Sequence, residues 1–367
     1  MNKIDEVKQS VIKNWKDYKG LIKAVKPKKI ESIFLKRFDP HVNPVSKKDE
    51  PTKMVEEAVI PFVANINDHI MINLVDYKKE QVDQELKKLI NGVASKCTIN
   101  MTMGISNVYI PKDRDGKITL PGLQQWCYAR ASLLRSSLVL SEQSIKVAVH
   151  PEAVVKCEGK HSPFGNVKDL FKEEDIVQDM YIPLCTTGSY TGESVVLGTD
   201  NNRISGSSIV NCSAIAGTLK QGDFITIENV FEVNKFTRES TRYLKTFTVL
   251  EDVPSGATEI PVFPKMIPIQ EIDATVFSLP DKGSKITPIL PPERKYRRNI
   301  IFSNDTLFVA FSETGVEKTC VTIDENDGFF SSRVTRQNDT MLRVDILGGS
   351  MVLFPDTGCV VPYFHYE

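Results

Sequence analysis

Apolar residues near the start of the chain recur with the spacing of one helical face. Between residues 3 and 25 they lie three or four positions apart, which is the period of an α-helix. They are Ile4, Val7, Val11, Trp15, Tyr18, Ile22 and Val25. Pro27 cannot continue a helix. The pattern therefore predicts an amphipathic helix over residues 3–25 that ends before this proline.

A longer helix is predicted over residues 78–103. Its apolar positions again recur at helical spacing and are Val82, Leu86, Leu89, Val93, Cys97 and Met101. At about 1.5 Å per residue such a helix is roughly 37 Å long, which exceeds the usual globular helix. We expect it to serve as a structural spine.

Shorter elements surround this spine. Three prolines within residues 39–53 predict an extended loop, and the apolar runs 54–63 and 69–75 on either side of NIND predict a hairpin. Further helices are expected near 122–139, after His150–Pro151 and over 165–180, with a buried strand at 145–149. Helices and strands do not alternate regularly, so a parallel doubly wound sheet is not expected.

The pattern changes to alternating strands from about residue 181. Successive strands are predicted at 224–233, 243–252 and 258–264, joined by polar turns, within an all-β unit that spans residues 203–288. A proline-rich exit follows at 287–293. Mixed patterning then resumes, with a helix or strand at 303–311 and strands at 318–323, 341–347 and 351–361. The simplest interpretation is an α+β protein with an inserted all-β unit.

Composition and charge exclude several classes of function. The chain has 367 residues, of which 41% are apolar and 25% charged, as in a folded protein of two or three units. Its net charge of -1 gives no sign of a dedicated nucleic-acid binder. No apolar run is long enough for a membrane span or a secretion signal, and seven cysteines without a signal indicate reduced thiols. We expect neither secretion by a signal peptide nor a membrane-spanning segment, and no membrane is among the expected partners.

The first 29 residues form a basic arm. Nine lysines stand against Asp5, Glu6 and Asp17, which gives +6, while the rest of the chain carries -7. A basic amphipathic helix can lie on a membrane, dock on a partner or contact a polyanion. It can equally pack its apolar stripe on its own core, and the sequence leaves these alternatives open.

No common catalytic or nucleotide-binding motif occurs in the chain. His150, Cys157 and His161 could supply three metal ligands, but a fourth ligand and a C-x-x-C spacing are missing. Cys157 and His161 could also pair as nucleophile and base, but no third group orients them. We therefore predict no enzyme, no cofactor and no catalytic, cofactor-binding or metal-binding residue.

A binding module that grips single-stranded nucleic acid is an alternative from another class, because small β-barrels do so through exposed aromatic rings in a basic groove. The available aromatics of the β unit are Phe224, Phe231, Phe236, Tyr243 and Phe247. The acidic residues that dilute the positive charge around them are Asp223, Glu228, Glu232, Glu239, Glu251 and Asp252. These acids weigh against that alternative.

Four stretches carry a resemblance to a known family. INLVDYKKEQVDQELKKLINGVASKCTI (72–99), IKVAVHPEAVVK (145–156) and LRVDILGGSMVLFPDTGCVV (342–361) follow one another in an order that resembles the major capsid protein of tailed bacteriophages. Herpesvirus capsid floors and bacterial encapsulin shells share this fold. Residues 216–252 further resemble the inserted β-barrel of coat proteins of the short-tailed Salmonella phage type. An encapsulin-like cellular shell protein is the nearest alternative.

The resemblance implies a division of the chain. It comprises an N-terminal arm (1–38), an extended loop and hairpin (39–75), a peripheral domain with the spine helix (76–150), an axial domain (151–202 and 289–367) and the inserted barrel (203–288). The barrel is expected to serve folding and contacts between capsomers. Lys47, Lys48 and Lys53 lie in the extended loop, but no cross-link is expected of this branch.

The resemblance also implies a function and partners. The chain is expected to self-assemble as hexamers and pentamers into an icosahedral shell around double-stranded DNA. A scaffolding protein and a portal are the other expected partners. The protein is expected in the capsid of the virion, after assembly in the cytoplasm of the bacterial host.

Overall fold

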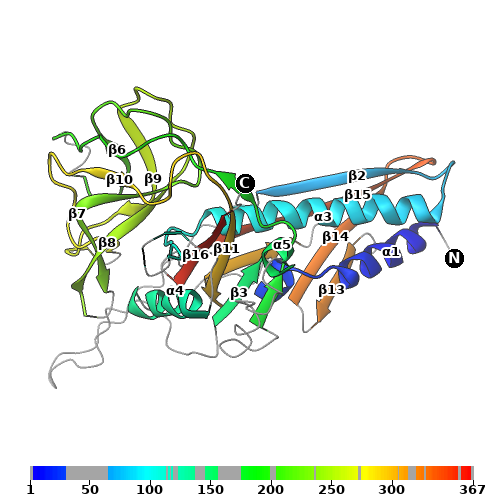
Figure 1. Cartoon of the computed structure of the whole chain (residues 1–367). Coiled ribbons are helices and arrows are strands. Elements are labelled where there is room, and N and C mark those ends of the chain that lie inside the picture. The colour runs from blue at the N-terminus through cyan, green and yellow to red at the C-terminus, as the bar shows by residue number, and fades with distance from the viewer. Residues whose placement is uncertain are drawn as a thin grey trace, which may run out of the picture.

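The computed structural model of the chain is an α+β protein, as the sequence predicts (Figure 1). It describes residues 3–29, 65–112, 115, 117–118, 123–136, 145–155, 175–198, 204–234, 237–271, 274–304, 306–312, 320–325, 328–353 and 357–364. Within these residues the strands form three sheets. The predicted extended loop over 39–53, the run 54–63 and the lysines Lys47, Lys48 and Lys53 lie outside them.

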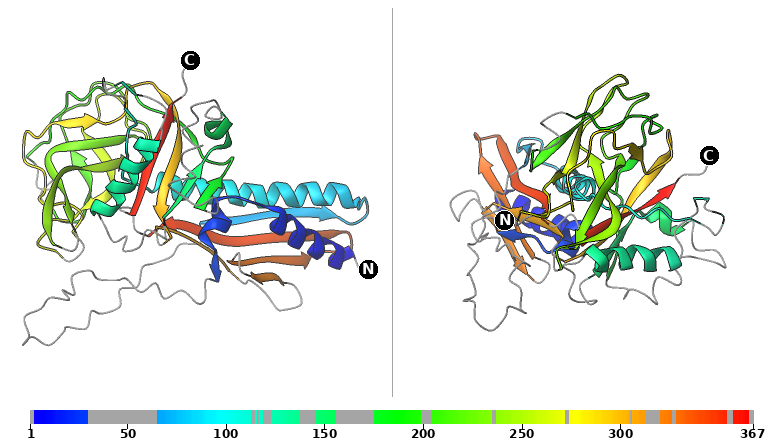
Figure 2. Two further views of the ribbon diagram at one scale, coloured as in Figure 1. Left: turned by 60° about the horizontal axis from the view of Figure 1, so that its bottom comes forward. Right: turned by 90° about the vertical axis from the view of Figure 1, so that its left-hand side faces the viewer.

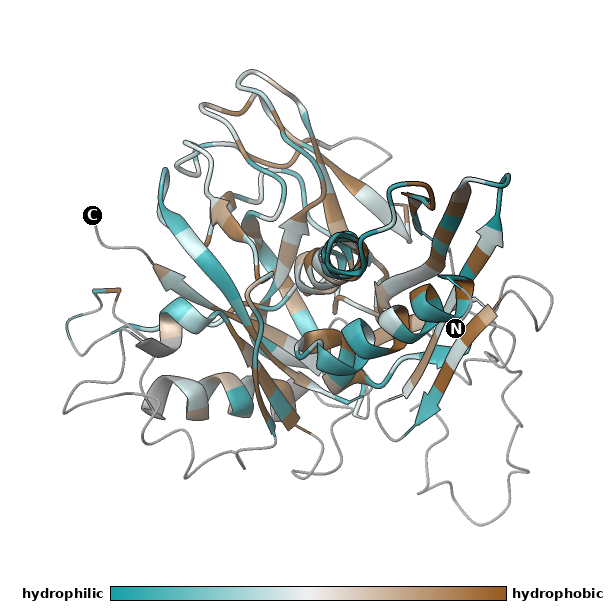
Figure 3. Cartoon of the chain, turned by 90° about the vertical axis from the view of Figure 1, so that its right-hand side faces the viewer, coloured by the Kyte–Doolittle hydropathy of each residue, from teal (hydrophilic) through white to brown (hydrophobic). Residues whose placement is uncertain are grey.

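The long helix α3 (Lys79–Met103) has the bounds that its apolar spacing predicts. Its inward face buries the predicted stripe from Val82 to Met101, and its outward face is polar. In Figure 3, which looks along this helix, its near end carries hydrophilic residues. The β-strands β2 (Ile66–Asn73) and β15 (Met341–Val352) run beside α3 (Figures 1 and 2). The helix is thus the spine of one half of the molecule.

The predicted helix over 3–25 is broken in two. The structure has α1 (Lys3–Asp17) and α2 (Leu21–Val25), followed by the short strand β1 (Lys28–Lys29). The break falls at Gly20, where a side chain would collide with the Tyr18 hydroxyl and the Asp179 carboxylate. Asp179 Oδ2 accepts the backbone N–H of Leu21 at 2.8 Å and so caps the first turn of α2. Asp179 is distant from α2 in the sequence, so the apolar periodicity could not predict this break between the two helices.

The apolar stripe of this arm packs on the chain's own core. Val7, Val11, Trp15 and Ile22 are buried in the same cluster as the inward face of α3. Trp15 stacks on Phe330 with 4.0 Å between ring centroids. The stripe is therefore not available to a membrane or a partner helix, and only the basic face remains exposed.

Asp179 joins the arm to the spine. Its carboxylate is buried and accepts hydrogen bonds from Leu21 N, from Tyr181 N at 2.7 Å and from the Thr98 hydroxyl at 3.1 Å. Burial, and next the negative charge of Asp179, raise the pKa of Tyr18, so this phenol stays neutral at all ordinary pH. One carboxylate thus connects α2, α3 and the segment after residue 178.

We expect Asp179→Ala to loosen α2. The substitution leaves three donors without their acceptor, and each buried donor left unpaired costs about 1–3 kcal/mol. The expected result is a lower free energy of unfolding in urea, together with faster tryptic cleavage at the lysines of residues 19–26. Asp17→Ala is the matched control, because Asp17 is exposed at the end of α1. Equal cleavage rates in both variants would contradict the capping role.

The first sheet has the strand order β1-β12-β15-β14-β13. The strand β2 lies off this path and also pairs with β15. Its remaining strands are β12 (Leu307–Phe311), β13 (Cys320–Glu325) and β14 (Gly328–Arg336). Two predictions are corrected here. NIND is not a turn, because its residues 66–68 begin β2 and pair with β15, Ile66 opposite Gly348. The predicted boundary between strands 341–347 and 351–361 is also wrong, because β15 continues unbroken to Val352.

The sheet that contains the chain's last strand has the order β16-β11-β3-β4, with β5 also paired to β11. Its strands are β3 (Ile145–Val149), β4 (Ile176–Gln178), β5 (Leu184–Thr186), β11 (Lys295–Ser303) and β16 (Gly358–Phe364). Helices α4 (Leu123–Ser136) and α5 (Pro151–Val155) agree with the predicted helices. The predicted helix 165–180 is wrong at its end, because residues 176–178 pair in parallel with β3 as a strand. The rest of that segment lies outside the described residues.

The third sheet lies wholly within residues 207–288 and has its own core. Its order is β10-β7-β8-β9-β6, from β6 (Ser207–Asn211), β7 (Phe224–Asn234), β8 (Glu239–Val249), β9 (Glu259–Met266) and β10 (Ile286–Pro288). Its apolar cluster includes Ile225, Phe247 and Val262 and is separate from that of the host. Figure 1 shows this sheet as a compact unit beyond one end of α3. We call residues 188–293 the β unit and the remainder the host.

Candidate functional site

The chemistry-bearing residues singled out in the sequence do not form a described site. His150 lies at the end of β3, where its Nδ1 accepts the backbone N–H of Glu152 at 3.2 Å and lies 3.8 Å from the Glu152 carboxylate. Cys157 and His161 lie outside the described residues. Within the described ranges, no group of three or more His, Cys, Asp or Glu side chains is arranged to hold a metal ion. None of the helices there is both long and apolar enough to cross a membrane.

Six cysteines fall within the described residues, and all are free thiols. Burial raises the pKa of Cys97, on the inward face of α3, to about 12. The thiol, not the reactive thiolate, is therefore its form at neutral pH. Cys127, on the outward side of α4, is exposed.

We expect these two thiols to differ strongly in alkylation. At pH 8 iodoacetamide should modify Cys127 within minutes, whereas Cys97 should remain unmodified until the chain unfolds, and raising the pH to 9 should not change this. Site-resolved mass spectrometry of the native and urea-unfolded protein measures both rates. Modification of Cys97 in the native protein would contradict its place inside the spine.

The aromatic residues of the β unit do not form a platform for bases. Phe224 and Phe247 are buried, Phe231 is half-buried, and Tyr243 is 55% exposed; Phe236 lies outside the described residues. Among the acids that the sequence places around them, Asp223 and Glu232 are buried, and Glu228, Glu239, Glu251 and Asp252 are exposed. The single-strand-binding alternative is therefore not favoured.

A buried group with several hydrogen bonds lies where the β unit meets the end of the spine. Arg298 of β11 is fully buried, and its guanidinium donates to the carbonyl oxygens of Gly222 at 2.7 Å, Thr102 at 3.3 Å and Ile105 at 3.2 Å. The Thr102 carbonyl belongs to the last turn of α3, whose C-terminal end carries partial negative charge, and Ile105 follows two residues after the helix ends. Phe224 packs over the guanidinium at 4.5 Å. We call Arg298, Gly222, Asp223, Phe224, Tyr296, Thr102 and Ile105 the joint.

The turn before β7 brings the β unit into this joint. Asp223 Oδ2 accepts the backbone N–H groups of Lys220 at 2.8 Å and Gly188 at 2.9 Å. Burial raises the pKa of Asp223, while these hydrogen bonds and the charge of Arg298 oppose the rise. Gly222 has φ of 90°, and a Cβ there would lie 2.5 Å from Met103 Cε and 3.2 Å from Arg298 Nη1. The positive φ favours glycine at this turn.

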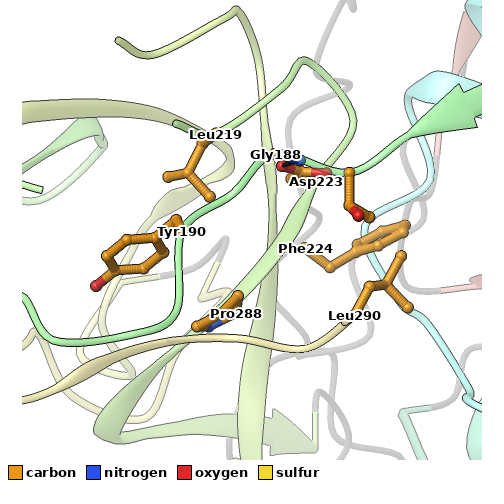
Figure 4. A pocket seen from close by; sticks show the side chains of 8 residues that line it. Gly188, Tyr190, Leu219, Asp223, Phe224, Pro288 and Leu290 are labelled. Atoms are coloured by element: carbon orange, nitrogen blue, oxygen red, sulfur yellow. Dashed lines mark hydrogen bonds between the residues drawn. The ribbon is translucent and has the colours of Figure 1, made fainter. Parts of the chain in front are cut away.

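Two further bonds tie the unit to the host. The Thr248 hydroxyl of β8 donates to the Ile105 carbonyl at 3.2 Å, and the Tyr296 hydroxyl donates to the Gly222 carbonyl at 3.3 Å. A small cavity of about 10 Å³ lies beside the joint, where the chain enters and leaves the β unit. Gly188, Asp223 and Leu290 are among the residues that line it (Figure 4). This is room for one water at most. The joint is therefore a mechanical connection and not a ligand pocket.

Sequence reasoning missed Arg298 and Asp179. The run KYRRNIIFS does contain a signal for Arg298, because it shares the strand face of Tyr296, Ile300 and Phe302. A charged residue on an apolar strand face indicates a buried, bonded cation. Asp179 follows a short strand and carries no comparable signal.

Comparison with solved structures gives partial likenesses to chains of bacteriophages and of a virus-like particle. The virus-like particle from Pyrococcus furiosus is 9% identical, with 98% of this chain and 100% of that chain covered and a TM-score of 0.44. The mature capsid of bacteriophage PhiM1 is 11% identical, with 94% and 87% covered and a TM-score of 0.38. A chain of Mycobacterium phage Che8 is 11% identical, with 84% and 76% covered and a TM-score of 0.31. No curated protein sequence matches the chain.

A family match identifies the class and does not depend on those likenesses. Residues 192–359 match the family described as "P22 coat protein - gene protein 5". The chain is therefore a structural protein of the bacteriophage capsid, a major capsid protein and not an enzyme. Within that class, the matched stretch takes in the β unit from residue 192 onward and the strands β11 to β15, so it includes Arg298 and the turn at Gly222.

Proposed function

We propose that the chain assembles as hexamers and pentamers into an icosahedral shell around double-stranded DNA. The family match over residues 192–359 carries the proposal, because it spans the β unit together with the host strands that follow. The long spine helix gives the subunit the reach that extensive contacts between neighbours require. The shell would be that of the virion, assembled in the cytoplasm of the bacterial host. A coat protein of the short-tailed Salmonella phage type, with an inserted barrel, fits this role best.

The proposed division of the subunit follows the resemblance. Residues 1–38 form the arm, 39–75 the extended loop and hairpin, 76–150 the peripheral domain, 151–202 and 289–367 the axial domain, and 203–288 the barrel. The separate apolar core of the β unit supports an inserted barrel, although that core begins at Tyr190, before the proposed boundary. The burial of α1 against α3 supports a peripheral domain that includes part of the arm.

The interior partners proposed for the shell are DNA and an acidic scaffolding protein, with a portal at one vertex. Support comes from the basic face of the arm, which the core leaves exposed. Lys13, Lys19, Lys26 and Lys28 are exposed there and form no ion pair with another described residue. Such lysines contact phosphates or carboxylates without reading sequence.

Electron microscopy and light scattering of the purified chain test the proposal. The chain is expressed alone and with its candidate scaffold, and the expected products are closed shells or tubes tens of nanometres across. A chain that stays monomeric or dimeric under both conditions would overturn the proposal. Pentamers and hexamers are then distinguished by image classification of the shells.

A further inference from the structure

One outer face of the β unit carries a continuous row of exposed apolar side chains. Leu250 lies beside Pro261 of β9, because Leu250 N donates to the Pro261 carbonyl at 2.9 Å, and Pro261 lies opposite Ile209 of β6. Leu197 lies on the adjoining segment opposite Asn211, whose carbonyl accepts Leu197 N, and therefore two positions along β6 from Ile209. Leu250 is 43% exposed, Ile209 39% and Leu197 37%. We call these four residues the barrel row.

The barrel row is edged by carboxylates. Glu251 and Glu259 are exposed beside it, and neither forms an ion pair within the described part of the chain. Together with Ile209 and Pro261 they line a shallow hollow of about 170 Å³. Small-molecule pockets are typically about 300–1,000 Å³, so this hollow suits a single large side chain rather than a ligand. The row thus presents an apolar surface with a negative edge.

A second surface on the host has the opposite charge. Met180 follows β4 and is 65% exposed, and Leu184 begins the edge strand β5 and is 46% exposed. Thr186 pairs with Lys295, so Leu184 and Lys295 lie on the same face of the ribbon. Lys295 and its neighbour Arg294 are exposed and form no ion pair with any residue described. We call Met180, Leu184, Arg294 and Lys295 the host knob.

We propose that the host knob of one copy docks on the barrel row of a second copy. Both surfaces are exposed within one chain, so a contact between them joins two copies. Apolar side chains would fill the hollow while the cations of the knob face Glu251 and Glu259, and charge complementarity of this kind selects partner and register. The two surfaces differ, so the contact is heterologous, which is the type of contact that links the subunits of a pentameric or hexameric ring. The inference rests on the proposed function and names one of its contacts.

Charge reversal tests the contact. Glu259→Lys and Lys295→Glu each place like charges together, and each is expected to lower the yield of shells about tenfold or more, while the double variant recovers most of it. Glu271→Lys, on an exposed loop of the same unit away from the row, is the matched control. Circular dichroism of each unassembled variant separates misfolding from failed contact. Single variants that assemble normally, or a double variant no better than its parents, would overturn the proposal.

A cross-link locates the contact directly. Ile209→Cys and Leu184→Cys chains, each also carrying Cys127→Ser to remove the exposed native thiol, are co-expressed, and the shells are oxidised and run on a non-reducing gel. A dimer that contains one chain of each kind is expected, with no dimer when either variant is expressed alone. Shells that form but give no mixed dimer would refute this contact and leave the proposed function intact. A wild-type chain that forms no shells would overturn both.

Discussion

Replacing Arg298 by alanine should abolish stable folding of the joint. The substitution removes the charged donor from the carbonyls of Gly222, Thr102 and Ile105, which keep only a neutral hydroxyl or backbone donor, and opens a cavity beside Phe224. Hydrogen bonds that involve a charged group contribute about 1.5–3 kcal/mol each, so the loss of three costs several kcal/mol. That is a large part of the about 5–15 kcal/mol by which domains are stable. We expect insoluble protein, or a soluble chain whose urea midpoint falls sharply.

Two companion variants make this result specific. Arg298→Lys keeps the charge but loses the planar fork that reaches three carbonyls, so its free energy of unfolding should fall between wild type and alanine. Arg333→Ala removes an exposed arginine from β14 and should change stability by about 0.5 kcal/mol or less. If Arg298→Ala unfolded at the same urea concentration as Arg333→Ala, the joint would not have the role assigned to it.

Trp15→Ala should detach the arm from the first sheet. Trp15 is 2% exposed, stacks on Phe330 and meets the edge of Phe311 with 5.6 Å between centroids. Truncation of a buried tryptophan costs about 3–5 kcal/mol through lost burial and the cavity that remains. Urea unfolding followed by circular dichroism measures the loss. The yield of shells should fall with it, because the exposed sheet face favours aggregation.

Lys13→Ala is the control for this variant, since Lys13 lies on the exposed face of the same helix. It should leave the unfolding midpoint almost unchanged. Trp15→Phe should recover part of the loss, because phenylalanine retains much of the apolar area and the ring stacking. A Trp15→Ala chain as stable as Lys13→Ala would mean that the arm contributes nothing to the fold.

Regular periodicity was the most informative signal in the sequence. The spine was predicted over 78–103 and found at Lys79–Met103, because its stripe repeats without interruption and faces one core. The β unit was equally readable, since strands β7, β8 and β9 are separated by polar turns. Strands β11 and β14 were missed for the opposite reason. Both bury successive residues, so neither shows the alternation that marks a half-buried strand.

The joint could not be predicted, because its bonds connect distant parts of the chain. Arg298 binds carbonyls of Thr102 and Ile105, more than 190 positions earlier, and backbone carbonyls carry no residue-specific signal. The break at Gly20 has the same origin, because the capping Asp179 lies 158 residues from Leu21. Local sequence patterns predict single helices and strands, whereas these contacts depend on how the helices and strands pack against one another.

The two ends of the β unit are bonded to each other, and this affects the order of folding. Thr187 N donates to Arg294 O at 3.0 Å, and Glu293 N donates to Gly188 O at 3.1 Å, so the chain leaves the host and returns at one place. For the host, pairing β5 with β11 means closing a loop as long as the whole unit, and the entropy lost grows with the length of flexible chain. If the unit folds first, its own structure brings these ends together. The insertion then acts during folding as a short turn, and the host strands on either side can pair as neighbours.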